Sequence, residues 1–317
     1  HGFPECGSAF PANLTCGISP GHHRPSSVVM GPGSLTRAYT LHDGIGHEAA
    51  RTVSEVAVRN LQVGILGWGA IGQTLARQIT DRTRDGAIAG CSLEVSAVAS
   101  RFSGGTAHPL MVPADELGDH CGVIVEAAGP QAVRDHVESY LAGGTDVVLL
   151  SLGALADTNL RSSLLAAGPG RLAFCSGAIG GLDIIEAARL HGRVRQVTFE
   201  TIKPAAVLER DWMSEELCAA LRSRAEVVEC FRGTVADAVT RFPESLNVSA
   251  ALALAAGSFE VVEVTVTGSP TATVNTHNVV VEADSGTYRF EITNAPSPDN
   301  PKTSHVTAWA ALRSLHN

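Results

Sequence analysis

The sequence is poor in charged and aromatic residues and contains no long uninterrupted apolar run. Asp, Glu, Lys and Arg make up 17% of the 317 residues and Phe, Trp and Tyr only 5%, with a net charge of -9. Lys and Arg form no cluster, which argues against a surface for nucleic acid or an anionic membrane. No apolar stretch approaches the roughly 20 residues that a membrane-spanning helix needs. We therefore expect neither nucleic-acid nor membrane partners.

The seven cysteines form neither a metal-binding nor a disulfide pattern. They are scattered along the chain, their number is odd, and no pair has the Cys-x-x-Cys spacing. Short paired spacings are typical of zinc and redox sites, and dense even sets are typical of secreted disulfide frameworks. We expect reduced thiols, no metal site and a cytoplasmic location.

The first sixty residues differ in character from the rest. Residues 1–33 are rich in Pro, Gly, Ser and His and have little periodicity. Such composition is typical of disordered or vector-derived sequence. Met30 is a candidate native start, and residues 35–59 would suit a helix or an arm. We expect residues 1–60 to be a disordered or poorly structured extension.

The most informative segment present is an apolar run that ends in three spaced glycines. Residues 63–66 lead into Gly67-Trp-Gly-Ala-Ile-Gly72, and an amphipathic run follows at 73–79. This order predicts a strand, a tight turn and a helix whose free N–H groups bind a dinucleotide pyrophosphate. The alternative is a glycine-rich turn without a ligand. The predicted cofactor-binding residues here are Gly67, Gly69, Ala70, Ile71 and Gly72.

Strands and helices alternate beyond this turn. The expected strands are 93–99, 123–127, 146–151 and 171–175, and the expected helices are 131–142 and 159–167. A βαβ succession predicts a doubly wound (Rossmann) parallel sheet of the α/β class, which binds ligands beyond the carboxyl ends of its strands. We assign residues 61–176 to a dinucleotide-binding domain.

The rhythm changes after residue 176. The expected helices are 182–190, 235–242 and 248–256, and the expected strands are 195–201, 227–231, 261–266, 272–282 and 287–293. Three late strands in succession predict an antiparallel or mixed sheet, so residues 177–302 form a second, α+β substrate domain. The amphipathic segment 303–315 predicts a closing helix that packs back on the first domain.

The second strand ends without a carboxylate. An acidic residue there would bind the adenine ribose and favour NAD, but the chain has Ser100 and Arg101. A guanidinium is well suited to a 2′-phosphate. We therefore predict that both NAD and NADP are accepted and that Ser100 and Arg101 bind the cofactor. Alternatively, Arg101 lies over the adenine or points to solvent.

Small residues follow the next two strands, where nicotinamide and ribose would lie. Ala128, in Glu-Ala-Ala-Gly-Pro, and Ser151, in Ser-Leu-Gly-Ala, are cofactor-binding candidates. We expect Glu126 to be structural and to bind backbone N–H groups beneath the site. A second glycine-rich turn, 176–183, suits either an anion site or a domain hinge, and its Asp183 is a candidate helix cap.

Several segments, taken in order, resemble the L-aspartate dehydrogenase family. They are Gly67–Gly72, Ser176–Asp183, Leu246-Asn-Val-Ser249, Asn275-Thr-His277 and Asn300-Pro-Lys-Thr-Ser304. The resemblance covers about residues 62–315 and departs at Ser249, where the pattern has alanine. It implies reversible NAD(P)-dependent oxidative deamination of L-aspartate through iminoaspartate to oxaloacetate and ammonia. It also implies that His277 is the active-site histidine, that Ala178 and Asn247 bind the dinucleotide, and that the chain forms a homodimer.

The residue chemistry agrees with a site of this kind. An imidazole titrates near neutral pH, so His277 can move a proton on the amine or on the water that attacks the imine. Two substrate carboxylates need cations or hydrogen-bond donors, for which Lys203, Lys302 and Thr303 are candidates. Lys302 fits a structural link between domains equally well. The other functions considered are a related reductase of another small dicarboxylate or semialdehyde, and a non-catalytic NAD(P)-binding redox sensor.

Overall fold

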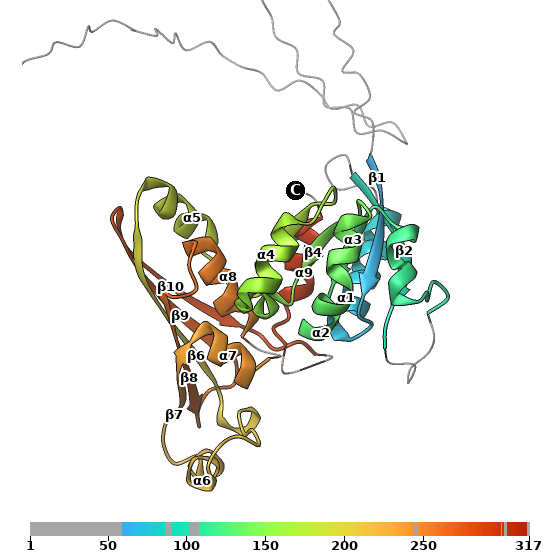
Figure 1. The fold of residues 1–317 in the computed structure, drawn as a ribbon. Helices are drawn as coiled ribbons and strands as arrows, with labels where there is room; N and C mark the ends of the chain where they lie inside the picture. The colour runs from blue at the N-terminus through green and yellow to red at the C-terminus, as the bar shows by residue number, and fades with distance from the viewer. Residues whose placement is uncertain are drawn as a thin grey trace, which may run out of the picture. The chain divides into compact units, whose positions relative to one another are not determined.

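The computed structural model describes residues 59–85, 91–101, 108–243, 246–298, 300 and 303–315. The expectations for residues 1–58, and the substrate-binding prediction for Lys302, lie outside the described residues. The described chain contains two five-stranded sheets, which we call sheet A and sheet B. Figure 1 traces their elements along the chain.

Sheet A is parallel throughout and contains the glycine turn. Its strands have the order β2-β1-β3-β4-β5. They are β1 (Arg59–Leu66), β2 (Cys91–Ala99), β3 (Val123–Glu126), β4 (Asp146–Leu149) and β5 (Leu172–Phe174). The central strands are short apolar runs because helices cover both of their faces. The predicted doubly wound sheet is confirmed.

The helices of sheet A follow its strands in the predicted order. They are α1 (Ala70–Asp85), α2 (Pro130–Ala132), α3 (Glu138–Ala142) and α4 (Thr158–Ala166), with short turns η1 (Ala114–His120), η2 (Val133–Val137) and η3 (Leu152–Ala156). The single helix expected over 131–142 is therefore interrupted. The interruption is a π-helical turn, η2, in which Val133 and Val137 are both fully buried.

Sheet B is mixed, which confirms the expectation for the second half. Its strands are β6 (Val194–Pro204), β7 (Val228–Thr234), β8 (Val262–Ser269), β9 (Asn275–Ala283) and β10 (Gly286–Asn294). Their order is β10-β9-β6-β8-β7, and only β6 and β8 run parallel. The three late strands are thus not all adjacent, because β6 lies between β8 and β9.

Helices cover one face of sheet B (Figure 1). They are α5 (Leu182–His191), α7 (Val235–Arg241) and α8 (Asn247–Ala256). The alanine-rich α8 is buried on nearly every side, because it packs against α5, β6, β8 and the η3 turn of the sheet A half. Two elements between β6 and β7 were not predicted from the sequence: α6 (Glu215–Ser223) and the short turn η4 (Ala205–Val207).

The last helix, α9 (Thr307–Ser314), packs against α1. The helix predicted over 303–315 therefore begins later than expected, and Thr303 and Ser304 precede it. A turn holds this segment, because Ser297 N–H donates to the Thr303 carbonyl and Ser304 forms an isolated bridge with Pro296. These contacts hold the backbone of Thr303 and Ser304 in a turn, so the helix begins only after them.

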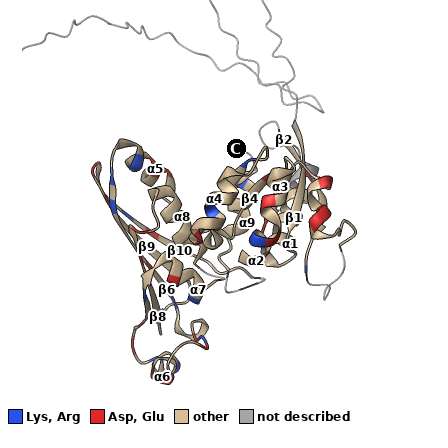
Figure 2. Ribbon diagram, viewed as in Figure 1, with Lys and Arg blue, Asp and Glu red and all other residues tan. Residues whose placement is uncertain are grey.

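Charged residues occur on elements of both sheets, as Figure 2 shows for the described chain. Of the helices described, none has the length and apolar character to cross a membrane. The described residues contain no group of three or more His, Cys, Asp or Glu that could hold a metal ion.

Candidate active site

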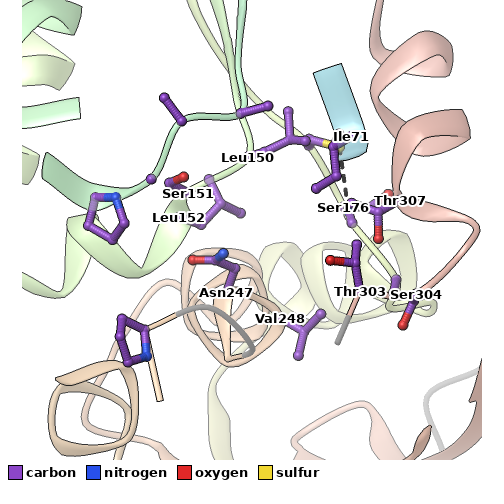
Figure 3. Close-up of a pocket in the computed structure, with 18 of the residues that line it drawn as sticks. Ile71, Leu150, Ser151, Leu152, Ser176, Asn247, Val248, Thr303, Ser304 and Thr307 are labelled. Atoms are coloured by element: carbon purple, nitrogen blue, oxygen red, sulfur yellow. Dashed lines mark hydrogen bonds between the residues drawn. The ribbon is translucent and has the colours of Figure 1, made fainter. Parts of the chain in front are cut away.

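A cavity of about 430 Å³ lies where the carboxyl ends of the sheet A strands meet the second half of the chain. Most of the predicted site residues line it, and Figure 3 shows part of this lining. From the sheet A half come Ile71, Arg101, Ala128 and Ser151. From beyond β5 come Ala178, Lys203, Asn247, His277 and Thr303. Residues more than 200 positions apart therefore share one cavity, as Ile71 and His277 do.

The remaining described candidates lie next to the cavity rather than on its wall. Gly67, Gly69, Ala70 and Gly72 flank Ile71 in the glycine turn, and Ser100 precedes Arg101 at the end of β2. Arg101 is exposed, and no carboxylate accompanies it at this strand end.

The glycine turn has the close contacts and the open space that a dinucleotide site requires. Gly67 has φ +109°, and a Cβ at Gly72 would lie 2.0 Å from the Gly67 carbonyl oxygen. A Cβ at Gly69 would meet nothing within 4 Å. The first and third glycines thus allow tight packing, and the second leaves the backbone open to a ligand. These residues fit a dinucleotide pyrophosphate at the start of α1.

Glu126 lies beneath this site as a fully buried carboxylate. Its Oε1 accepts hydrogen bonds from Ala128 N–H (2.9 Å), Gly129 N–H (2.8 Å) and the Ser151 hydroxyl (2.9 Å). Its Oε2 accepts one from Ser151 N–H at 2.9 Å. Burial raises the pKa of Glu126, and these four donors oppose that rise because they stabilise the ionised form. Glu126 therefore holds two strand-end loops together, as expected.

Asn247 connects the two halves of the chain. Its Oδ1 accepts a hydrogen bond from Gly153 N–H at 2.9 Å. Gly153 lies in η3, which begins directly after Ser151, and Asn247 is the first residue of α8. In the view of Figure 3, Ser151 and Asn247 lie near one another on the cavity wall. The side-chain oxygen of Asn247 therefore already has a hydrogen-bond partner within the protein.

The second glycine turn is packed against β10. Asn294 Nδ2 donates to the Ala178 carbonyl at 3.0 Å, and a Cβ at Gly181 would lie 2.7 Å from the Phe290 ring. Gly181, with φ +81°, occupies the N-cap of α5. The proposed capping role of Asp183 is therefore wrong, because a left-handed glycine turn begins the helix and places Asp183 inside its first turn.

His277 and Lys203 are nearly fully buried in the part of the cavity next to sheet B, with exposed fractions of 3% and 5%. Desolvation, with the positive charge of Lys203 as a second cause, lowers the pKa of His277 to about 4. Desolvation and the nearby charge of Arg210 lower the pKa of Lys203 to about 8. Within the described chain no carboxylate forms an ion pair with Lys203, so the site has a buried positive charge.

Two buried polar atoms of sheet B have no hydrogen-bond partner among the described residues. They are His277 Nδ1 and Thr201 Oγ1, which are both buried. Thr201 on β6 lies opposite His277 on β9 in the antiparallel register. Buried polar atoms normally have hydrogen-bond partners, so two such atoms without one indicate a functional site.

Several cavity residues were not predicted to be part of the site. They include Pro130, Gln131, Cys175, Asn275 and Thr307. Pro130 and Gln131 directly follow a strand-end loop that was predicted, and Asn275 lies two residues from His277 on the same face of β9. The strand alternation could therefore have identified Asn275.

Comparisons with known proteins agree with this arrangement. A family model described as aspartate dehydrogenase, C-terminal, matches residues 183–317. A second model, described as homoserine dehydrogenase, NAD binding domain, matches residues 67–169. The second match confirms the prediction of a nicotinamide dinucleotide cofactor.

Individual relatives match most of the chain. L-aspartate dehydrogenase from Methanopyrus kandleri is 35% identical over 277 residues, covering 80% of this chain and 95% of the relative. The enzyme of the same name from Methanosarcina mazei is 35% identical over 260 residues, covering 80% and 96%. The crystal structure of Thermotoga maritima aspartate dehydrogenase superposes with a TM-score of 0.62 at 28% identity, covering 81% and 96%. The motif resemblance is thereby confirmed, and the chain belongs to the L-aspartate dehydrogenase family of oxidoreductases.

Proposed function

We propose that this chain catalyses the reversible NAD(P)-dependent oxidative deamination of L-aspartate, with His277 as the catalytic residue. The observation that carries the proposal is that His277 and Lys203 line the same cavity as Ile71 of the glycine turn and as Ala128 and Ser151 at the strand ends of sheet A. A dinucleotide held at that turn would lie along the carboxyl ends of the strands, where this cavity opens. Substrate held by Lys203 would then lie between the nicotinamide and the imidazole.

The sheet A half is proposed to bind the cofactor. A bound dinucleotide would supply the acceptor for the hydride that leaves Cα of aspartate. The glycine turn and the N–H groups that begin α1 hold the pyrophosphate, as Gly69 leaves open space on its side-chain face. Ser100 and Arg101, at the end of β2, are proposed to bind the adenosine end. The nicotinamide end is assigned to the cavity residues Ala128, Ser151, Ala178 and Asn247.

Lys203 is proposed to bind a substrate carboxylate. A buried ammonium group without a carboxylate partner is costly, and a bound dicarboxylate would supply the missing charge. Thr303 lies on the same cavity and is proposed as a hydroxyl donor to a carboxylate. Lys302, next to it in sequence, remains a second proposed anchor.

His277 is proposed to act as the base. Its low pKa keeps the imidazole neutral at pH 7, so a ring nitrogen is free to accept a proton. A carboxylate bound at Lys203 offsets the charge that lowers this pKa, and so raises the basicity of His277 when substrate is present. The imidazole can then take a proton from the substrate amine or from the water that attacks the imine.

The organisation of the chain is part of the proposal. We propose a dinucleotide domain at 61–176, a substrate domain at 177–302, and return of 303–315 to the first domain, which the contact of α9 with α1 supports. We also propose a homodimer that uses the face of sheet B opposite its helices. The alanine-rich helix α8 is buried within the chain and so is not part of the proposed interface. The free thiols of the described cysteines support a reducing, cytoplasmic location.

The test is turnover with oxaloacetate, ammonium and NADH or NADPH. We expect oxidation of the dinucleotide, and we expect His277→Ala to lower kcat by about two to four orders of magnitude. His191→Ala, at the exposed end of α5, is the matched control and should leave kcat unchanged. Normal dinucleotide binding without turnover of any dicarboxylate would contradict the proposal and favour a redox sensor.

A further inference from the structure

The hydrogen bond between Glu126 and Ser151 has a fixed direction. Glu126 accepts three bonds through Oε1 and one through Oε2, and three of these four donors are backbone N–H groups that cannot accept. A protonated Glu126 could direct its hydrogen at the Ser151 oxygen, but the three backbone N–H groups that point at its two oxygens favour the ionised form. Ser151 therefore donates its hydroxyl hydrogen to Glu126.

Ser151 is consequently left with acceptor capacity alone. A hydroxyl has one hydrogen and two lone pairs, and Glu126 takes the hydrogen. The serine is 5% exposed, and its remaining surface lines the cavity (Figure 3). The loop that follows it is held as well, since Gly153 N–H, two residues further on, donates to Asn247 Oδ1. The Ser151 oxygen thus has little freedom to change its direction.

We propose that Glu126 is a positioning residue that makes the Ser151 hydroxyl a hydrogen-bond acceptor for a ribose hydroxyl of the bound dinucleotide. This inference rests on the proposed function, which places the nicotinamide end of the cofactor at Ser151. The ribose on that end carries hydroxyls that can donate. The same carboxylate sets the adjoining loop, through Ala128 and Gly129, so one buried group shapes both loops that meet the cofactor.

The direction of the bond is tested with the unmodified protein and dinucleotide analogues. One hydroxyl of the nicotinamide ribose in NADH is replaced by hydrogen or by fluorine, which accepts but cannot donate. The deoxy analogue that lacks the hydroxyl facing Ser151 should bind about tenfold more weakly than NADH, because it loses one hydrogen bond. The matching fluoro analogue should bind no better than the deoxy analogue. A fluoro analogue that binds as tightly as NADH would overturn the proposal.

The role of Glu126 is tested by a double-variant comparison. Ser151→Ala should bind NADH and the deoxy analogue equally, and Glu126→Gln should show the same loss of discrimination. The double variant should lose no more than either single one, because all three remove one interaction. Asp146→Asn is the control, since Asp146 binds Arg171 at the opposite end of β4 and should leave the tenfold preference intact.

The outcomes separate this inference from the proposed function. Full discrimination in folded Glu126→Gln, checked by its thermal transition, would mean that the carboxylate only stabilises the loops. If that variant does not fold, the analogue series on the unmodified protein still decides the direction of the bond. Turnover of oxaloacetate with equal binding of all analogues would overturn this inference alone, whereas failure to bind any dinucleotide would overturn the function.

Discussion

Lys203 on β6 and His277 on β9 are buried in one cavity, and this burial, followed by the charge of the lysine, lowers the pKa of the histidine. Neither side chain has a carboxylate partner within the described chain. The two strands are adjacent, with Thr201 of β6 opposite His277. The site therefore keeps a positive charge and a neutral base close together in a dry environment, where electrostatic interactions are strong.

The first prediction concerns the pH dependence of dicarboxylate binding. Succinate, which has no amine to titrate, should inhibit competitively, and its Ki should only about double between pH 7 and 8. Above the Lys203 pKa of about 8, Ki should rise about tenfold per pH unit, because the neutral amine no longer attracts the dianion. His277, with its pKa of about 4, does not titrate in this range. Inhibition kinetics from pH 7 to 10 measure the profile.

Lys203→Arg is the control for that profile. A guanidinium stays charged throughout the range, so the break near pH 8 should disappear even if Ki is higher overall. A Ki for the unmodified protein that stays flat to pH 10 would show that Lys203 does not hold the inhibitor.

The second prediction concerns acid stability. The folded-state pKa of His277 lies near 4, below its ordinary value of 6.5. Between these values the unfolded chain binds a proton that the folded chain does not. The contribution of His277 to the free energy of unfolding is thus complete above pH 6.5 and is lost as the pH falls through 4, by up to about 3 kcal/mol. Urea unfolding at several pH values measures it.

The comparison variant is His277→Asn, which does not titrate. Other acidic groups change in both proteins, so the difference in unfolding free energy isolates the histidine. That difference should vary by about 3 kcal/mol between pH 6.5 and 4. A difference that is independent of pH would contradict the burial of a neutral imidazole.

Local patterns predicted much of the fold. Runs such as 123–127 and 146–151 became buried parallel strands, because uninterrupted apolar residues at strand length fit a sheet covered on both faces. The missed helix, α6, did carry a start signal, since Ser214 caps Leu217 N–H and two glutamates follow it. The late start of α9 has a different cause. Thr303 and Ser304 belong to a hydrogen-bonded turn whose partners, Pro296, Ser297 and Asn300, lie after β10, and periodicity does not reveal such contacts.

The site was predictable where motifs or strand ends mark it. Ser151 follows a strand, and Glu126 was expected to bind backbone N–H groups at such an end. The bond between Gly153 and Asn247 joins residues 94 positions apart, and no local pattern encodes that distance. The burial of Lys203 was equally hidden, because lysine is among the residues most often exposed.

The third prediction concerns the choice between NAD and NADP. Arg101 is exposed on the rim of the cavity, at the end of β2. Arg101→Ala should weaken NADPH binding about tenfold or more and change NADH binding little, because only NADPH carries the 2′-phosphate. Fluorescence titration of both dinucleotides measures the two Kd values. Arg171→Ala, at the far end of sheet A, should change neither, and an equal loss of both in Arg101→Ala would remove the phosphate role.

The last prediction separates the two tasks of the glycine turn. A Cβ at Gly72 would lie 2.0 Å from the Gly67 carbonyl oxygen, so Gly72→Ala must displace the backbone and should lower Tm markedly. A Cβ at Gly69 would meet no atom within 4 Å, so Gly69→Ala should leave Tm unchanged. It should still weaken NADH binding, because the added methyl group occupies the space through which a pyrophosphate approaches the N–H groups of α1. Thermal unfolding and NADH titration of both variants measure the contrast. Unaltered NADH affinity in Gly69→Ala would place the pyrophosphate elsewhere, and an unaltered Tm in Gly72→Ala would contradict the packing of the turn.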